Sequence, residues 1–274
     1  MPRIGVCSWT LRPQSPDDLA ARIRACGVTA VQLALDPIRK AAAGWDERST
    51  EGILRQSGIR IVSGMMGTVG EDYSTLDSIR RTGGLRSDEH WPANLEAARA
   101  NAAIAQRLGL RLVTLHAGFL PHEPGDELRS TMIARLRQIA DAFAERGIEV
   151  GLETGQEDAT TLLGVLQEIG RGNLGVNFDP ANMILYGMGE PVDALHRLAS
   201  WVKQVHIKDA IPTTTPGEWG TEVAVGTGAV DWARFFGIVQ HELKAVNLLI
   251  EREAREDRVN DVRTAAELVR RFVG

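Results

Sequence analysis

The sequence predicts a (β/α)8 TIM barrel, in which eight parallel strands are enclosed by helices. Three observations lead to this fold class. Short apolar runs alternate with helical patterns about eight times along the 274 residues. Four of these runs follow at once on a glycine that can close a helix, at Gly27, Gly58, Gly109 and Gly147. No GxGxxG fingerprint follows the first run, which disfavours an open nucleotide-binding sheet.

We expect eight strands, because these runs are apolar on both sides, as strands buried on two faces must be. Their expected ranges are 3–9, 28–35, 59–65, 111–116, 148–153, 174–179, 202–207 and 246–251. No linker rich in Pro or Ser interrupts the series. We therefore expect one TIM-barrel domain spanning residues 1–274.

Helices are expected where apolar residues recur at three- and four-residue spacing. The ranges are 16–26, 92–107, 127–146, 159–169, 191–199, 231–243 and 257–272. The first has the clearest start, since Ser15 is a favoured cap and Pro16 suits a first helical turn. Residues 66–91 and 210–230 are expected to form long loops over the barrel mouth.

Composition excludes several classes of protein. The net charge is −5, without a block of like sign, which argues against broad nucleic-acid binding. Two cysteines, Cys7 and Cys26, are too few for a disulfide framework, and a reducing cytoplasm is expected. The N-terminal residues lack the apolar core of a signal peptide, and no stretch reaches the ~18 apolar residues of a membrane span.

Residues that can bind metals stand at five successive predicted strand ends: His116, Glu153, Asp179, His206 and Glu251. The carboxyl ends of the strands face the active site in such a barrel. Neighbouring strands lie about 4.8 Å apart, so the last four side chains can converge. We expect them to hold one divalent cation.

Three carboxylates and one imidazole form a hard, oxygen-rich set that suits Mn²⁺, Mg²⁺ or Co²⁺ and admits Zn²⁺. Taken singly, each residue has a simpler explanation. The glutamates could cap a helix or pair with an arginine, Asp179 could cap a helix that starts at Pro180, and His206 could be a satisfied core residue. Five polar strand ends in succession favour the metal site.

The sequence resembles the xylose-isomerase-like superfamily of sugar isomerases and epimerases over essentially its whole length. The motifs are LHAGFLP (115–121), LET (152–154), NFDPANMILYG (177–187), VHIKD (205–209), GTGAVDW (226–232) and IERE (250–253). They are specific for the superfamily and not for a substrate. In ketose epimerases of this type a Glu, an Asp, a His and a second Glu bind the metal, which implies Glu153, Asp179, His206 and Glu251 here.

The resemblance implies a metal-dependent isomerase or epimerase of a small sugar, sugar phosphate or related hydroxy-carbonyl compound. Glu153 and Glu251, on opposite faces of the substrate, would remove and return a proton through a metal-stabilised enediolate. The alternative is a dehydratase of the inosose or dehydroshikimate type, which shares this chemistry. The reaction, the metal, phosphorylation of the substrate and the oligomeric state stay open, although relatives often form homo-oligomers.

The sequence departs from the superfamily at Asn182, where a His is frequent. An Asn can hydrogen-bond a substrate hydroxyl but binds metal weakly. Abasic-site endonucleases of the superfamily hold three zinc ions with extra histidines. Here only His116 and His206 fall at strand ends, and Glu222 stands where the nucleases carry a metal-binding His. A nuclease is therefore disfavoured, and His116 is expected to hydrogen-bond substrate or to serve the structure.

Two further residues are predicted to contact the substrate. Lys208 lies on the same side of its strand as His206, and either binds a substrate oxygen or phosphate or pairs with Asp209. Trp9, at the end of the first strand, could form an apolar wall together with Trp219. A core position for Trp9 and an interface position for Trp219 are the alternatives. Gln32 receives no role.

Overall fold

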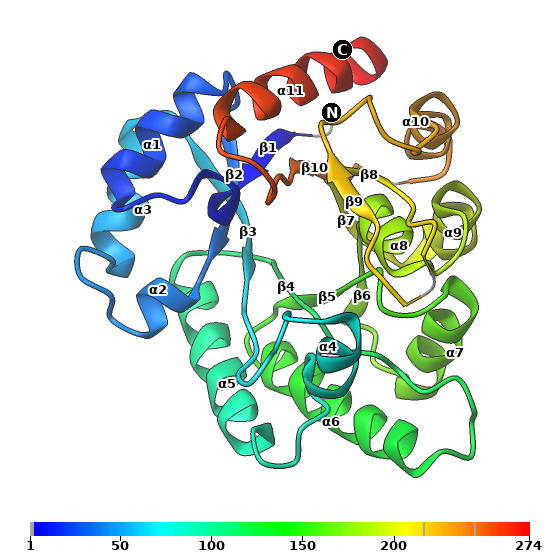
Figure 1. Ribbon diagram of the computed structural model, residues 1–274. Helices are drawn as coiled ribbons and strands as arrows, with labels where there is room; N and C mark the ends of the chain where they lie inside the picture. Colours follow the sequence, from blue (N-terminus) through cyan, green and yellow to red (C-terminus); the bar gives the residue numbers. More distant parts are fainter. Residues whose placement is uncertain (1–2, 216, 244) are drawn as a thin grey trace.

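The strands close into one parallel barrel, which confirms the predicted fold class. The computed structural model describes residues 3–215, 217–243 and 245–274. The strand order around the barrel is β1-β10-β7-β6-β5-β4-β3-β2, and every neighbouring pair is parallel. Figure 1 shows the strands at the centre, with helices around them.

All eight barrel strands lie within their predicted ranges. They are β1 (Ile4–Cys7), β2 (Ala30–Ala34), β3 (Arg60–Met65), β4 (Leu112–Leu115), β5 (Glu149–Glu153), β6 (Leu174–Phe178), β7 (Val202–Ile207) and β10 (Asn247–Ile250). The first strand is shorter than expected. It ends at Cys7, and the 3-10 turn η1 (Ser8–Leu11) follows, so Trp9 lies beyond the strand rather than at its end.

The outer helices alternate with these strands (Figure 1). They are α1 (Pro16–Ala25), α3 (Glu47–Gln56), α5 (Trp91–Arg107), α6 (Glu127–Ala144), α7 (Ala159–Ile169), α9 (Pro191–Leu198), α10 (Trp232–His241) and α11 (Arg258–Val273). Seven match the predicted helices to within two residues. The predicted cap of α1 is also confirmed, because Ser15 Oγ accepts a hydrogen bond from the Asp18 N–H at 3.2 Å.

Helix α3 is missing from the prediction because Ile53 and Leu54 are its only large apolar residues. Its start carries a signal nonetheless, since the Asp46 carboxylate accepts the Ser49 N–H at 2.9 Å. In the part of the chain that the structure describes, no helix is both long enough and apolar enough to cross a bilayer.

The two predicted long loops contain short elements. Helix α4 (Leu76–Thr82) interrupts the first loop, and β8 (Asp209–Ile211) pairs antiparallel with β9 (Thr221–Val223) in the second. Two further short helices follow strands directly, α2 (Asp36–Arg39) after β2 and α8 (Pro180–Tyr186) after β6. Each begins near the barrel mouth, where the chain turns back toward the outer layer.

Alternating strand residues separate the apolar core from a polar interior. In β7, Val205 and Ile207 belong to the buried apolar core, whereas Gln204 and His206 join a polar network inside the barrel. Successive side chains of a strand point to opposite sides, so Lys208 follows His206 to the barrel interior. The sequence VHIKD thereby places two polar groups at the mouth while its apolar residues face the helices.

Asp209 ties the second loop to the barrel. Its buried carboxylate accepts hydrogen bonds from the backbone N–H groups of Gly226, Gly228 and Val230 at 2.9, 3.0 and 3.2 Å. The indole N–H of Trp232 donates to it at 3.0 Å. A Cβ at position 228 would overlap this carboxylate, so only glycine fits there. The GTG sequence thus forms a tight turn around one aspartate.

Replacing Asp209 with Ala would leave these buried N–H groups without acceptors. We expect the free energy of unfolding to fall by about 3–5 kcal/mol, measured by urea denaturation. Asp193, whose exposed carboxylate pairs with Arg234 at 3.1 Å, provides the control. Asp193→Asn is expected to cost less than about 1 kcal/mol. Equal stability of the two variants would contradict the anchoring role of Asp209.

Candidate metal centre

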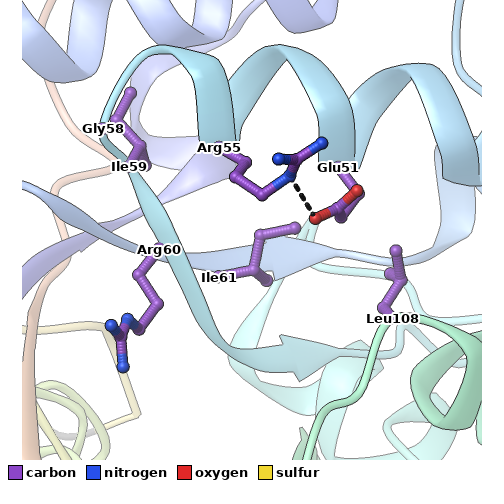
Figure 2. A pocket seen from close by; sticks show the side chains of 7 residues that line it. All are labelled: Glu51, Arg55, Gly58, Ile59, Arg60, Ile61 and Leu108. Atoms are coloured by element: carbon purple, nitrogen blue, oxygen red, sulfur yellow. Dashed lines mark hydrogen bonds and ion pairs between the residues drawn. The ribbon is translucent and has the colours of Figure 1, made fainter.

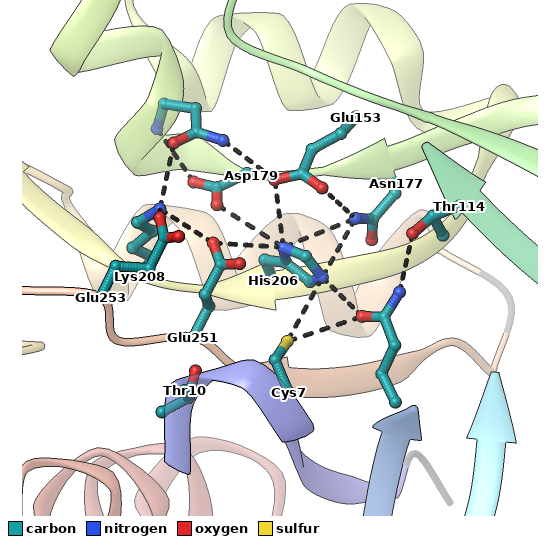
Figure 3. A network of polar contacts seen from close by, with 12 residues as sticks. Cys7, Thr10, Thr114, Glu153, Asn177, Asp179, His206, Lys208, Glu251 and Glu253 are labelled. Atoms are coloured by element: carbon teal, nitrogen blue, oxygen red, sulfur yellow. Dashed lines mark hydrogen bonds and ion pairs between the residues drawn. The ribbon is translucent and has the colours of Figure 1, made fainter. Parts of the chain in front are cut away.

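Four side chains converge at the carboxyl end of the barrel, as the sequence predicts. They are Glu153, Asp179, His206 and Glu251, and one ligand atom of each lies within 4.8 Å of the others. Nδ1 of His206 lies 3.4 Å from a Glu153 oxygen and 3.6 Å from oxygens of Asp179 and Glu251. All four are at most 4% exposed, and Figure 3 shows them around the imidazole.

This donor set fits a divalent cation. One carboxylate oxygen of Asp179, Oδ2, is buried and has no hydrogen-bond partner among the described residues. Burial raises the pKa of Asp179 to about 6. Burial also disfavours the imidazolium of His206, but Cys7, Glu153 and Glu251 raise the pKa of His206 well above its usual range. The cluster thus favours a positive charge at its centre, which a hard, oxygen-preferring cation would supply.

The residues after β5 and β6 hold two of these carboxylates in place. Thr154 Oγ1 donates to the Asp179 carbonyl at 2.9 Å and accepts the Asp179 N–H at 2.8 Å. Gly155 has a φ of +134° and passes so close to Asn182 that a Cβ would overlap that side chain. Asn182 in turn donates to Glu153 Oε1 at 2.9 Å. Asn182, a predicted substrate-binding residue, therefore also orients Glu153.

Gln32, to which the sequence assigned no role, contacts the imidazole of His206 on the side of Nε2. Its Oε1 accepts a hydrogen bond from His206 Nε2 at 2.7 Å and from Gln204 at 2.9 Å. Its amide nitrogen donates to Thr114 Oγ1 at 2.7 Å and to the Gly64 carbonyl at 3.3 Å. In the neutral imidazole these contacts place the proton on Nε2, so that Nδ1 faces the carboxylates with its lone pair.

Lys208 pairs with two glutamates at the cavity. Its Nζ lies 2.9 Å from Glu251 Oε2, 2.7 Å from Glu253 Oε2 and 3.3 Å from Asn182 Oδ1. Burial disfavours the charged amine, but Glu251 and Glu253 raise the pKa of Lys208 well above its usual range. The pairing with Asp209, one of two predicted alternatives, is wrong because Asp209 binds the GTG turn instead.

Glu251 is held at both oxygens. Trp9 donates its indole N–H to Oε1 at 2.6 Å, and Lys208 donates to Oε2. Burial raises a carboxyl pKa, yet Lys208 and His206 lower the pKa of Glu251 well below its usual range. Trp9 also lies beside the imidazole of His206, with ring centroids 6.2 Å apart. Trp9 thus contacts the cluster directly and is not a core residue alone.

Glu222 fixes the loop that follows Glu251. Its carboxylate accepts the backbone N–H groups of Glu253 and Ala254 at 3.0 and 3.1 Å and pairs with Arg252 at 2.8 Å. This is the position where the superfamily's nucleases carry a metal-binding His. Here the carboxylate is engaged by Arg252 and by the backbone of this loop.

A cavity of about 530 Å³ opens above the cluster. Its lining residues are Trp9, Ala34, Asp36, Met65, Gly67, Glu71, Tyr73, His116, Glu153, Asn182, Tyr186, Glu251 and Glu253. Gly67, Glu71 and Tyr73 come from the first long loop, which confirms that this loop borders the mouth. Trp219 is not among the described lining residues but packs edge-to-face against Tyr186, which is, with ring centroids 4.9 Å apart.

His116 lies in the cavity wall beside Glu153, with 3.8 Å between its Nε2 and Glu153 Oε2. Burial disfavours its charged form, but Glu153 and Glu71 raise the pKa of His116. Its position suits a hydrogen bond to a bound molecule. Further polar lining residues that the sequence did not indicate are Asp36, at the start of α2, and Glu71, Tyr73 and Glu253, in irregular segments.

A second hollow, of about 390 Å³, lies at the other end of the barrel, between α3 and the start of β3 (Figure 2). It offers the ion pair of Arg55 and Glu51, 3.1 Å apart, and Arg60. Among the described residues, every group that could hold a metal includes His206 and Glu251. The one other such group adds Cys7, whose pKa burial raises to about 12, so that its thiol stays protonated.

Comparison with known proteins agrees with this architecture. A sequence model of the xylose isomerase-like TIM barrel matches residues 20–272. The crystal structure of a xylose isomerase domain protein from Planctomyces limnophilus has 30% sequence identity and a TM-score of 0.86, with 99% of this chain and 97% of that chain covered. No curated protein matches the sequence significantly.

Two more distant structures share the fold. A D-allulose 3-epimerase from Methylomonas sp., in complex with D-allulose, has 17% identity and a TM-score of 0.73, covering 99% of this chain and 97% of that one. A xylose isomerase-like TIM barrel protein from Mycobacterium smegmatis, in complex with magnesium, has 15% identity and a TM-score of 0.75, covering 100% and 97%.

Metal content tests the centre directly. After loading with Mn²⁺ and desalting, we expect about one ion per chain by elemental mass spectrometry, since four ligands surround one position. Glu153→Gln should weaken Mn²⁺ binding at least about 100-fold, because it removes a charged ligand. Glu51→Gln, the same change in the second hollow, should retain the ion. A wild-type protein without bound metal, or with three ions, would refute a single-metal centre.

The contact between Gln32 and His206 predicts a separate effect. Gln32→Leu removes the acceptor for the Nε2 proton, and we expect about 10- to 100-fold weaker Mn²⁺ binding by calorimetry. Gln32→Glu keeps an acceptor and should keep most of the affinity. Nitrogen-15 NMR of the neutral imidazole should find its proton on Nε2 in the wild type. An unchanged affinity in Gln32→Leu would exclude this positioning role.

Proposed function

Since the chain belongs to the xylose isomerase-like TIM barrel family, we propose that it is a divalent-metal-dependent isomerase or epimerase of a small polyhydroxy carbonyl compound. One observation carries this proposal. Two buried carboxylates, Glu153 and Glu251, line one cavity beside a donor set that fits a cation. The proposed acid–base groups and the position that fits a cation thus lie at one cavity of about 530 Å³.

The two glutamates approach the cavity from different strands. Glu153 ends β5 and Glu251 follows β10, with β6 and β7 between them in the barrel. One carboxylate removes a proton from the carbon beside the substrate carbonyl, and the other returns a proton to the opposite face. The hydrogen bonds from Asn182 to Glu153 and from Trp9 to Glu251 hold both side chains in position before the substrate arrives.

A cation held by Glu153, Asp179, His206 and Glu251 would stabilise the negative charge that develops on the substrate oxygens of the enediolate. The surrounding side chains bind the substrate and exclude water. His116 and Asn182 hydrogen-bond substrate hydroxyl groups from the cavity wall. Trp9 and Tyr186 cover the apolar faces of the substrate and exclude water.

The choice of a small carbohydrate as ligand rests on chemistry and comparison together. Polyhydroxy compounds match a wall rich in hydrogen-bonding groups, and the Methylomonas sp. relative of the same fold binds D-allulose. A hard cation such as Mn²⁺, Mg²⁺ or Co²⁺ is favoured by the three carboxylates. The net charge of −5 and the structural role of Glu222 favour a small molecule over nucleic acid. Both cysteines are free and buried, which suits the proposed cytoplasmic location.

Exchange of substrate hydrogen with solvent tests the acid–base assignment. In ²H₂O, the Mn²⁺-loaded enzyme should incorporate deuterium beside the carbonyl of a substrate sugar. Glu251→Gln should lower this rate by about 10²- to 10⁴-fold, with the Mn²⁺ concentration raised until metal occupancy equals that of the wild type. Glu51→Gln is the matched control.

Full turnover in Glu251→Gln would refute its acid–base role. Mass spectrometry of the product separates the reactions. An isomerase or epimerase leaves the mass unchanged apart from the label, whereas a loss of water would identify the dehydratase alternative.

A further inference from the structure

Resting on the proposed function, we infer that Glu71 is a specificity-determining residue, which makes the cavity select unphosphorylated sugars and reject their phosphate esters by charge. Glu71 lies in the loop between β3 and α4 and lines the cavity. It belongs neither to the cluster of metal-type ligands nor to the acid–base pair. Its carboxylate accepts the backbone N–H of Gly84 at 2.9 Å, which holds it at the mouth.

The cavity wall carries negative charge from several elements. Besides Glu153 and Glu251, the side chains of Asp36, at the start of α2, and of Glu71 and Glu253, in two loops, line it. No Lys or Arg is found among the described residues of the lining. A phosphate monoester carries a charge of about −1.5 to −2 at neutral pH, so each unbalanced carboxylate opposes its entry.

The cations nearest the cavity are already engaged. Lys208, at 2% exposure, is enclosed by Glu251 and Glu253. Arg39 pairs with Asp36 at 3.0 Å and balances that carboxylate. In the described part of the chain, no Lys or Arg forms an ion pair with Glu71. Of the three carboxylates Asp36, Glu71 and Glu253, Glu71 is therefore the one without a Lys or Arg partner among the described residues.

Two arginines of the first long loop, Arg80 and Arg86, do not line the cavity. Arg80 lies over the ring of Phe119, 5.3 Å from its centroid, and Arg86 donates to the carbonyl of Phe119. Both line a separate hollow of about 360 Å³, to which the carboxylates of the cavity do not contribute. They are thus not placed to neutralise a phosphate group beside Glu71.

A bound cation does not reverse this balance. Asp179, Glu153, Glu251, Glu253 and Glu71 supply five negative charges around the site. Lys208 and a divalent cation together supply three positive charges, so the site stays negative even when His116, whose pKa is raised, is protonated. Repulsion of a dianionic ester thus persists in the metal-loaded enzyme.

Hydrogen bonding also favours a free sugar over its phosphate ester. An ionised carboxylate only accepts hydrogen bonds. Each hydroxyl of a free sugar donates one, so Glu71 and Glu253 can each bind a hydroxyl group. A phosphate dianion offers only acceptors and leaves these carboxylates unsatisfied. Trp9, Tyr73 and Tyr186 supply apolar surface for the carbon–hydrogen faces of the sugar.

The test compares matched pairs of probes. D-fructose, D-allulose and L-ribulose are each measured beside their terminal phosphate esters, with Mn²⁺-loaded whole protein in ²H₂O, by NMR detection of exchange. The best free sugar should exceed its ester at least about tenfold in kcat/KM. Calorimetric dissociation constants for the same pairs should differ in the same direction, which measures the selection without turnover.

The inference also requires that charge repulsion causes the ratio of kcat/KM between a free sugar and its phosphate ester. Glu71→Gln keeps the acceptor for the Gly84 N–H and removes the charge, so the ratio should fall several-fold. Raising NaCl from 0.05 to 0.5 M should also lower the wild-type ratio, because salt screens charge repulsion. Glu51→Gln, in the hollow at the other end of the barrel, should leave the ratio unchanged.

The outcomes separate this inference from the function it rests on. Faster exchange of the esters would overturn the role of Glu71 while leaving the isomerase or epimerase function in place. A ratio that neither Glu71→Gln nor salt changes would show steric exclusion and would also overturn it. Absence of exchange with every probe, free or phosphorylated, would refute the proposed function and the inference together.

Discussion

The burial of like charges at the mouth of the barrel is the constraint on which the rest of the site depends. Glu153, Asp179 and Glu251 are almost fully enclosed and lie within a few ångströms of one another around His206. Such carboxylates are costly unless each is paired, hydrogen-bonded or bound to a cation. The neighbouring side chains meet this need in part: Lys208 and Trp9 bind Glu251, and Asn182 binds Glu153. One oxygen of Asp179 has no hydrogen-bond partner within the described part of the chain, which is why the cluster suits a cation.

The polar layer beneath the cluster follows from the same constraint. A barrel interior is usually filled by branched apolar residues, yet here Gln32, Thr114, Asn177 and Gln204 are all fully buried. Gln204 donates to both Gln32 and Asn177, and Asn177 donates to Glu153 at 3.2 Å. The chain of hydrogen bonds links β2, β4, β6 and β7 to the ligands. A fully connected buried network of this kind rigidifies the groups it holds.

The sequence alone predicted the barrel, its strands and the convergence of four residues that can bind a metal, because each rests on a local signal. A charged residue at the end of an apolar run is visible without knowledge of the fold around it. The role of Gln32 could not be predicted, although a lone Gln inside the apolar run of 28–35 was a signal. Whether such a residue meets His206 depends on strand register across the barrel. Glu71 and Glu253 lie in irregular loops, where no periodicity indicates which way a side chain points. Helix α3 lacked the apolar spacing that identifies a helix.

The antiparallel pair β8 and β9 has a consequence for how this protein can evolve. Asp209 and Glu222 anchor the two arms of the hairpin, one to the GTG turn and the other to the loop that follows β10. The described residues between the two arms, 212–215 and 217–220, lie outside these anchors. Changes in this stretch should leave Glu153 and Glu251 in place, while they reshape what stands beside Tyr186. The hairpin would then act as a frame in which one part of the chain can vary while the two proposed acid–base residues stay fixed.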